Sequence, residues 1–380
     1  MIRPGDGTIG VLGGGQLGRM IAVAARQLGY GVVVCAPEED APAAAVADRT
    51  IRAPYEDPDA LDALAGLCDV LTYEFENVPA GAVRALQARR PCRPDAELLE
   101  ITQDRLVEHA FLHRLGIATA SGVEVRDGPS LAAGLARLGG VCRLKSARGG
   151  YDGGGQWRVA DAEGRRAAEA VVAPGGRWLL EAEVAFDLEI SVVVARDVSG
   201  RAEVFPVFEN HHGDGILRVT RCPARASATA QARAVQIARV LAEAVNLVGT
   251  LTVECFVRGD EVVVNELAPR VHNSGHLTLE ACTISQFAQH VRAVVGLPVV
   301  APALRAPAAM VNLLGPAGVR ASGALAGVEA VDGGDVHVHL YGKRTVRPRR
   351  KMGHVTALAT SADLAEAAAG AAADALRFGW

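Results

Sequence analysis

The stretch from Val262 to His276 joins an apolar strand to a dense set of side chains that can do chemistry. Three consecutive valines predict a buried strand, and the polar residues Asn265, Glu266, Arg270, His272, Asn273, Ser274 and His276 follow it. Just upstream, Leu251 to Val257 predicts a second strand that carries Glu254. The polar segment Arg258 to Glu261 is short enough to be a hairpin turn, so Glu254 and Glu266 should lie side by side.

Two carboxylates inside valine-rich strands indicate a metal site. A buried carboxylate is costly unless it is paired or bound to a cation, and Mg²⁺ prefers oxygen ligands. A single strand glutamate is more often a solvated residue on the open face of a sheet. The pair, followed by Arg270 and two histidines, favours the metal interpretation.

A first glycine-rich segment, Gly13 to Gly18, contains G-x-G-x-x-G between a predicted strand at Thr8 to Leu12 and a predicted helix. Such a turn directs backbone N–H groups at an anion, usually a phosphate. NAD or FAD binding also requires an acidic residue at the end of the second strand, and Glu38 arrives too late for that position. A different phosphate, or close packing of helix on strand, are the other interpretations.

A second glycine-rich segment has five glycines between Gly149 and Gly155 and follows a predicted strand that ends at Lys145. Its amide groups could close over phosphates, and the lysine supplies the cation that a triphosphate requires. The alternative is a flexible hairpin tip without a ligand. The neighbouring Lys145 favours a phosphate-binding flap.

Composition limits the class of protein. The chain has 380 residues, 50% hydrophobic and 22% charged, with a net charge of -4. This fits two to four globular domains and gives no general attraction to nucleic acid or a membrane surface. Seven scattered cysteines without C-x-x-C predict core residues in a reducing cytoplasm. No stretch has the ~18 apolar residues of a membrane span, and the N-terminal residues lack a signal peptide's apolar core.

Alternating strands and helices position these residues. Helices are predicted at Asp59 to Leu67, Asp104 to Leu115, Ser130 to Leu138, Gln231 to Val245, Ser285 to Val295 and a closing stretch to about Phe378; strands are predicted at Gly31 to Cys35, Asp69 to Tyr73, Val141 to Lys145, Arg177 to Glu183, Ile190 to Ala195, Ala309 to Leu313 and Val336 to Leu340. Asn210 to Leu217 is polar and predicts turns. Glu74 and Glu76 follow a strand, where open α/β sheets bind ligands, although acids are common in loops too.

Six segments in order make the chain resemble the ATP-grasp superfamily, and within it the N5-carboxyaminoimidazole ribonucleotide synthetase family of purine biosynthesis. They are G-G-G-Q-L-G-R-M at 13–20, T-Y-E-F-E-N-V at 72–78, G-G-Y-D-G-x-G-Q-W at 149–157, D-G-I-L-R at 214–218, N-E-L-A-P-R-V-H-N-S-G-H at 265–276 and R-P-x-R-K-M-G-H at 347–354. Each short segment is weak alone, whereas six in the right order over nearly the whole chain are specific.

The resemblance implies a mixed α/β and α+β architecture, the ATP-grasp fold. We expect a Rossmann-like pre-ATP-grasp domain with a parallel sheet at 1–103 and a small ATP-grasp lobe with the flap at 104–180. A large ATP-grasp lobe with the metal site should follow at 181–300, and an appended C-terminal subdomain with a mixed or antiparallel sheet at 301–380. A homodimer is the expected assembly.

The resemblance also implies a ligase that uses ATP and bicarbonate to carboxylate the exocyclic amine of aminoimidazole ribonucleotide. The γ-phosphoryl group would pass to bicarbonate and form carboxyphosphate, a source of CO₂ in a closed site. Glu254 and Glu266 would hold Mg²⁺, with two ions expected. The residues expected at ATP are Arg105, Lys145, Gly150, Asp152, Gly153, Gln156, Glu181, Glu189 and Asn265.

The same resemblance implies residues for the reacting groups and the nucleotide substrate. Expected at the chemistry are Lys145, Tyr151, Arg270, His272 and Asn273; expected at the substrate are Gly15, Gln16, Leu17, Glu74, Tyr151, Asp152, His272, Lys343, Arg350 and Lys351. Arg270 could hold bicarbonate through its bidentate guanidinium, and the basic segment 343–351 supplies cations for a ribose 5′-phosphate. His276 is as suited to orienting its loop as to touching the substrate.

Two positions depart from the family pattern. Gly154 stands where arginine is usual, which removes a phosphate contact that Arg148 could replace. Arg349 stands where glycine is commoner, which predicts a changed turn.

Three other activities stay open: another ATP-grasp purine-pathway ligase, of the formate-dependent transformylase or glycinamide ribonucleotide synthetase type, an NAD-dependent oxidoreductase, and an ATP-binding regulatory module. The oxidoreductase leaves the paired glutamates unexplained, and the module leaves Arg270 with His272 unexplained.

Overall fold

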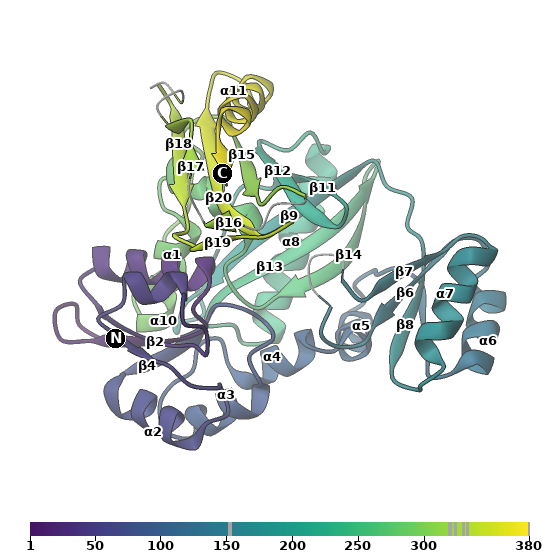
Figure 1. Cartoon of the computed structure of the whole chain (residues 1–380), viewed down its shortest axis with the longest axis horizontal. Coiled ribbons are helices and arrows are strands. Elements are labelled where there is room, and N and C mark those ends of the chain that lie inside the picture. Colours follow the sequence, from purple (N-terminus) through teal and green to yellow (C-terminus); the bar gives the residue numbers. More distant parts are fainter. Residues whose placement is uncertain (151–153, 318–320, 323–324, 329–330, 332–333, 379–380) are drawn as a thin grey trace.

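The structure is a computed structural model that describes residues 1–150, 154–317, 321–322, 325–328, 331 and 334–378. Three larger sheets follow one another along the chain. Figure 1 shows the N-terminal sheet and the small sheet with α6 and α7 at opposite ends of the molecule, with the large sheet between them. The C-terminal strands and α11 lie above the N-terminal part, so the two ends of the chain are brought to the same side.

The N-terminal part is a parallel sheet in the order β3-β2-β1-β4, flanked by helices. Its apolar strands are buried on both faces, which is the reason they are nearly continuous hydrophobic runs. The elements are β1 Thr8–Leu12, α1 Gln16–Gln27, β2 Gly31–Cys35, η1 Pro42–Ala45, β3 Arg49–Ile51, α2 Pro58–Leu67, β4 Val70–Tyr73, α3 Ala80–Gln87 and α4 Ala96–Thr102. This confirms the predicted parallel-sheet domain.

The small lobe is an antiparallel sheet in the order β5-β8-β6-β7, covered by α6 and α7. The helix α5, Arg105–Arg114, leads into it and begins at the N-cap Asp104, whose carboxylate accepts hydrogen bonds from two backbone N–H groups. The other elements are β5 Gly122–Val125, α6 Gly128–Leu138, β6 Cys142–Ser146, β7 Gln156–Val159, α7 Ala162–Val172 and β8 Trp178–Ala182.

The large sheet has nine strands in the described part of the chain, in the order β14-β13-β9-β11-β12-β15-β20-β18, with β10 beside β9. Its first strands pack against α8 and α10, and the C-terminal strands continue it without a break. The elements are β9 Leu188–Arg196, β10 Ala202–Val204, β11 Phe208–Gly213, β12 Ile216–Cys222, α8 Ala228–Ala244, β13 Gly249–Arg258, β14 Glu261–Ala268, η2 Asn273–Leu277, α9 Thr278–Ala281, α10 Gln286–Val295, β15 Ala308–Leu314, β18 Val336–Leu340, β20 Lys351–Leu358 and α11 Ala362–Ala375. Short pairs join β16 Ala321–Ser322 to β19 Thr345–Val346, and β17 Leu325–Ala326 to β21 Arg377–Phe378.

The hairpin predicted around the two glutamates is confirmed. Strands β13 and β14 pair antiparallel, and Glu254 lies directly opposite Glu266, with an irregularity in the register just after Glu254. The prediction of turns over Asn210 to Leu217 was wrong, because that segment belongs to the hairpin of β11 and β12 and only Asp214-Gly215 forms its turn. The polar side chains there belong to paired strands that face a pocket.

Candidate active site

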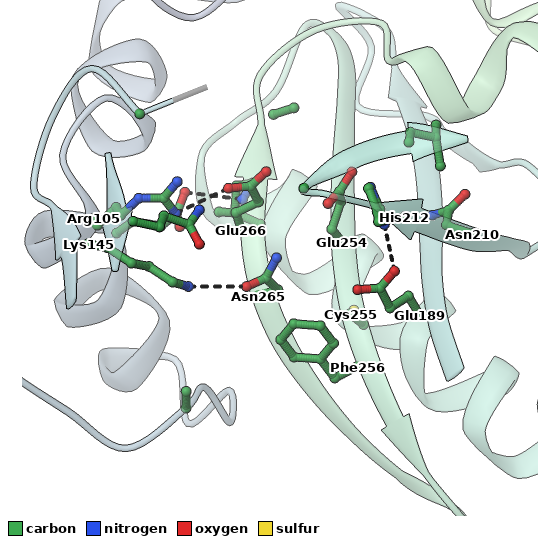
Figure 2. Close-up of a pocket in the computed structure, with 18 of the residues that line it drawn as sticks. Arg105, Lys145, Glu189, Asn210, His212, Glu254, Cys255, Phe256, Asn265 and Glu266 are labelled. Carbon is green, nitrogen blue, oxygen red and sulfur yellow. Dashed lines mark hydrogen bonds and ion pairs between the residues drawn. The ribbon is translucent and has the colours of Figure 1, made fainter. Parts of the chain in front are cut away.

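A cavity of about 680 Å³ lies between the small lobe and the large sheet. Figure 2 shows Arg105 and Lys145, from the small-lobe side, pointing toward Glu266 and Asn265 on β14, with Glu254, Glu189 and His212 beyond them. Most predicted residues line it: Gln16, Leu17, Arg105, Lys145, Gly150, Gln156, Glu181, Glu189, Glu254, Asn265, Glu266, Arg270, His272, Asn273 and Lys351. The fold therefore brings together residues more than 300 positions apart.

The paired glutamates each have a basic partner. Glu266 Oε2 lies 3.1 Å from Arg105 Nη1, and Glu254 Oε1 lies 3.0 Å from His272 Nε2. Burial would raise the pKa of Glu254, but His272, together with His212 and Arg270, lowers it to about 2. Glu254 is therefore ionised at neutral pH and available as an oxygen ligand.

A chain of hydrogen bonds fixes the orientation of His272. Its Nδ1 accepts from the backbone N–H of Ser274 at 3.3 Å, so the proton that is donated to Glu254 lies on Nε2. The Ser274 hydroxyl lies 2.9 Å from the same Nδ1 and accepts a hydrogen bond from the buried Ser191 of β9. Ser274 and Ser191 thus fix the orientation of the imidazole on the side away from Glu254. A side chain that binds a ligand needs this kind of support.

A lysine, a glutamate and a histidine converge on the wall formed by the small lobe. Lys145 Nζ lies 2.5 Å from Glu181 Oε2 and 3.4 Å from Asn265 Oδ1, while His109 Nε2 lies 2.9 Å from Glu181 Oε1. Burial would raise the pKa of Glu181, but His109 and Lys145 outweigh it and lower the pKa to about 2. Both oxygens of this buried carboxylate are accordingly occupied.

On the side of the large sheet, the pocket combines a paired glutamate and histidine with an aromatic wall. His212 Nδ1 lies 2.5 Å from Glu189 Oε2. Burial alone would lower the pKa of His212, but the hydrogen bond to Glu189 and the charge of Glu254 raise it. Phe256 stacks on Phe186 with ring centroids 4.6 Å apart and planes inclined by 14°. Both rings line the cavity and supply the flat apolar surface that a purine base stacks on.

Arg270 is almost fully buried and pairs with Glu76, which follows β4 in the N-terminal part. Burial would raise the pKa of Glu76, but the guanidinium outweighs it and the pKa is lowered. The neighbouring Asn273 lines the cavity, and neither polar atom of its amide has a partner within the described residues. A buried amide of this kind calls for a ligand or water. His276 is fully buried and packs against Phe287 and His354, so it orients the loop.

The glycine turn binds an anion that belongs to the protein itself. The Glu74 carboxylate accepts hydrogen bonds from the N–H groups of Gly15 and Gly18, at 2.5 and 2.7 Å. A Cβ at Gly13 or Gly15 would collide with Glu74, which is why these positions are glycine. In this structure Glu74 occupies both amides, so a phosphate on them stays a prediction. Neither Gly15 nor Glu74 lines the cavity, and their contact with a substrate stays a prediction.

The basic segment lies beside the glycine turn. Lys343 Nζ donates to Gln16 Oε1 at 2.8 Å, which joins two parts of the predicted substrate site. Lys351 is buried and lines the cavity, whereas Arg350 binds Thr345 and lies 3.7 Å from Asp40. Arg349 has φ 68, the left-handed conformation that favours glycine. The backbone here has a conformation suited to glycine, and a turn changed from that of the family stays a prediction.

The flap is only partly described. Tyr151, Asp152 and Gly153, which were predicted to bind the nucleotide and the substrate, lie outside the described residues. Arg148 was suggested as a replacement for the missing arginine at position 154, and it pairs with Asp104 at 3.1 Å. It is thus held at the start of α5.

Several residues of the pocket were missed from the sequence. They are Glu108, Asn210, His212, Phe186 and Phe256, which line the cavity, and His109, which lies behind its wall. Glu76, which was considered together with Glu74, also lines the cavity. Glu108 carries the clearest signal, an acid on the same helix face as Arg105, and burial raises its pKa to about 8. The histidines had no local signal, because their acidic partners come from distant strands.

Three family models match successive parts of the chain. The ATP-grasp domain model matches residues 110–287, the ribonucleotide synthetase preATP-grasp domain model matches 7–103, and the phosphoribosylaminoimidazole carboxylase C-terminal domain model matches 308–368. The N5-carboxyaminoimidazole ribonucleotide synthase of Brucella melitensis is 45% identical over 357 residues, covering 93% of this chain and 97% of that protein. The chain belongs to the N5-carboxyaminoimidazole ribonucleotide synthase family. The Bacillus subtilis member of this family is 41% identical over 362 residues, 94% of this chain and 92% of that protein.

Solved structures of the family have the same fold. An ADP complex of an N5-carboxyaminoimidazole ribonucleotide synthetase gives a TM-score of 0.91 at 39% identity, covering 98% of this chain and 97% of that one. The Aspergillus clavatus enzyme in complex with ADP and 5-aminoimidazole ribonucleotide gives 0.87 at 29% identity, covering 98% of both chains. The ATP-grasp fold class predicted from the sequence is confirmed.

The donor set on β13 and β14 fits Mg²⁺. Glu254 and Glu266 are opposed carboxylates, and Asn265 adds an amide oxygen between them and Lys145. Over the described ranges no three His, Cys, Asp or Glu side chains form a group able to hold a metal by themselves. Mg²⁺ in proteins commonly keeps water and phosphate oxygens among its ligands, so two carboxylates and an amide oxygen suffice as the protein's donors.

Proposed function

We propose that this chain is an ATP-dependent carbon–nitrogen ligase that carboxylates 5-aminoimidazole ribonucleotide with bicarbonate, giving N5-carboxyaminoimidazole ribonucleotide, ADP and phosphate. One observation carries the proposal: the paired Glu254 and Glu266 face Lys145 and Arg105 across a single cavity that also contains Arg270 and His272. A nucleoside triphosphate and a small anion can therefore be bound in contact with each other. Membership of the family supports the substrate assignment.

The chemistry has to activate bicarbonate, which is a poor electrophile. A bicarbonate oxygen attacks the γ-phosphorus, the bond to ADP breaks, and carboxyphosphate forms. Its C–O bond then breaks to release CO₂ and phosphate. The exocyclic amine attacks CO₂, a new N–C bond forms, and the amine loses a proton. Because water would destroy carboxyphosphate, the pocket must exclude it during the reaction.

At the ATP end, Lys145 and Arg105 provide positive charge for the phosphates, and Glu189 can accept hydrogen bonds from ribose hydroxyls. The stacked Phe186 and Phe256 offer a surface for the base. Glu254 and Glu266, with Asn265, would hold Mg²⁺, and the family resemblance implies two ions. When bound, Mg²⁺ neutralises the charge that develops on the transferring phosphoryl group.

At the other end, Arg270 and His272 are held rigidly and face the same cavity. A guanidinium can bind two oxygens of bicarbonate or of the transferring phosphoryl group at once. Asn273, whose amide has no partner among the described residues, would contact the imidazole nucleotide, and Lys351 would contact its phosphate. Lys343, beside Gln16, would extend the phosphate site.

The cellular setting is part of the proposal. All seven cysteines are buried and free, which fits a reducing cytoplasm. Within the described residues no helix is both long and apolar enough to span a bilayer. A homodimer is proposed from the family.

The test measures phosphate release from ATP while each substrate is supplied or omitted in turn. We expect release to require both bicarbonate and 5-aminoimidazole ribonucleotide. Formate or glycine in place of bicarbonate tests the transformylase and glycinamide ribonucleotide synthetase alternatives and should give no release. A rate of phosphate release that is the same with and without the imidazole nucleotide would reject the assignment.

A further inference from the structure

Helix α5 presents three polar side chains on one face, and each has a different partner. Arg105 binds Glu266, Glu108 accepts from the backbone N–H of Leu267 at 3.1 Å, and His109 binds Glu181. The spacing i, i+3 and i+4 places them together. Arg105 and Glu108 line the cavity, whereas His109 is behind the wall and reaches the cavity only through Glu181.

The contact between Lys145 and Glu181 creates a problem for nucleotide binding. Lys145 is the cation beside the flap, and in this structure its ammonium group is 2.5 Å from Glu181 Oε2. A phosphate bound beside the flap would compete with Glu181 for this ammonium group. Glu181 is only 4% exposed, so without another partner it would become an unpaired buried carboxylate.

We propose that His109 is a positioning residue for nucleotide binding, because it holds Glu181 when Lys145 moves to the phosphates. His109 Nε2 donates to Oε1, the oxygen that Lys145 does not use, so the two contacts are independent. Thr119 Oγ1 lies 3.4 Å from Nδ1 and supports the other edge of the ring. The hydrogen bond lowers the cost of releasing Lys145 and leaves Oε2 of Glu181 available to an amino group of the ligand.

This inference rests on the proposed use of ATP, but its test does not depend on carboxylation. The full chain and its variants would be titrated calorimetrically with ADP and with MgATP, and the KM for ATP and kcat would be measured separately. For His109→Leu we expect the dissociation constants and the KM for ATP to rise at least about tenfold, with kcat changed less than about threefold. His109→Gln places an amide N–H near the position of Nε2 and should restore affinity to within about threefold of wild type.

His113 provides a matched control on the same helix. Its Nε2 lies 2.8 Å from Thr119 Oγ1, and its ring packs edge-on against His109 with centroids 5.9 Å apart, but its partner is Thr119 and not Glu181. His113→Leu should bind ADP like the wild type. An equal loss in both leucine variants would show that His109 only supports the packing around Thr119 and would overturn the proposal.

A double-mutant cycle identifies the route of the effect. Glu181→Gln removes the charge that His109 serves, so His109→Leu should have little further effect in that background. Additive losses, or wild-type ADP affinity in His109→Leu, would contradict the proposal. If His109→Leu does not fold, His109→Asn removes the same contact with a shorter polar side chain, and the same outcomes apply. Failure of the carboxylation assay with intact ADP coupling would reject the proposed function alone.

Discussion

At the scale of single residues, acidic side chains of the pocket have basic side chains as their partners. Glu266 has Arg105, Glu254 has His272, Glu181 has Lys145 and His109, and Arg270 has Glu76. The pairing avoids an isolated buried charge. When a ligand binds, a ligand group of the same charge can take the place of one partner in a pair. The sequence indicated the two carboxylates that we propose bind metal, because acids in valine-rich strands are unusual. It did not indicate the partners, because pairing depends on contacts between distant segments.

Glu266→Gln should abolish most turnover while the fold is kept. Glutamine has the same shape but is a weaker ligand for Mg²⁺, so we expect kcat to fall at least about 100-fold. The measurement is phosphate release dependent on the imidazole nucleotide, with thermal unfolding as the check on folding. Glu261→Gln is the matched control, since Glu261 is on the same strand but exposed and paired with Arg258. A near-normal kcat in Glu266→Gln would reject the metal role.

Arg270→Ala should reduce kcat at least about 100-fold, because a donor to the developing charge is lost. It should also destabilise the protein, since the half-buried Glu76 loses its partner. The double variant Arg270→Ala with Glu76→Gln separates the two effects: urea unfolding should show recovered stability, but turnover should stay low. Recovery of turnover in the double variant would mean that Arg270 serves only to neutralise Glu76.

At the scale of elements, the sequence predicted most strands and helices to within a few residues and misread one segment. The hairpin of β13 and β14 and the helix α10 follow directly from apolar periodicity and end signals. The hairpin of β11 and β12 was missed because Asn210 and His212 face the pocket. Polar side chains on that face removed the alternation by which a strand is recognised. The glycine turn was recognised, but its anion was not, because Glu74 arrives from the next unit of the sheet.

The end of α8 offers a test of how the backbone shapes an element. Asn246 has φ 46 and follows the helix, and Leu247 N–H returns to Ala242 O at 2.9 Å, which closes a Schellman motif. Glycine adopts this conformation with less strain, so Asn246→Gly should raise the free energy of unfolding by about 0.5–1 kcal/mol. Urea unfolding measures the change, and Asn246→Ala should shift it in the opposite direction. Destabilisation by glycine would show that the asparagine side chain stabilises this turn.

At the scale of the whole molecule, buried histidines connect the parts. His290 on α10 lies 2.9 Å from Thr72 of β4 and 2.5 Å from Thr250 of β13, so it joins the N-terminal sheet to the large one. Its pKa is lowered by burial to about 3, and that of His276 likewise. The pKa of His354 is also lowered by burial. Sequence reasoning could not find this connection, because a histidine in an apolar helix face gives no sign of its partners.

These histidines predict loss of stability in mild acid. In the folded chain they stay neutral, whereas in the unfolded chain they bind protons below about pH 6.5. The contribution of these neutral histidines to the free energy of unfolding is therefore complete above about pH 6.5 and decreases as the pH drops toward about 4.5. Glu108 acts in the opposite direction, because its pKa of about 8 makes it bind its proton in the folded state first.

Three histidines against one glutamate leave a net uptake of two protons on unfolding. The free energy of unfolding should fall most steeply near about pH 5.5, by on the order of 2–3 kcal/mol per pH unit. Urea titrations between pH 7 and 5 measure the slope. A flat profile would contradict the burial of neutral histidines, and His290→Asn should give a shallower slope at a lower starting stability.

The central claim is that the pocket transfers the γ-phosphoryl group of ATP to bicarbonate before carbon reaches the amine. A single measurement tests it: turnover with ¹⁸O-labelled bicarbonate in unlabelled water, followed by mass analysis of the phosphate released. Because the bicarbonate oxygen that attacks phosphorus stays bound to it when the C–O bond breaks, we predict that each phosphate carries one labelled oxygen. Unlabelled phosphate, formed at the same rate as the carboxylated product, would contradict the account.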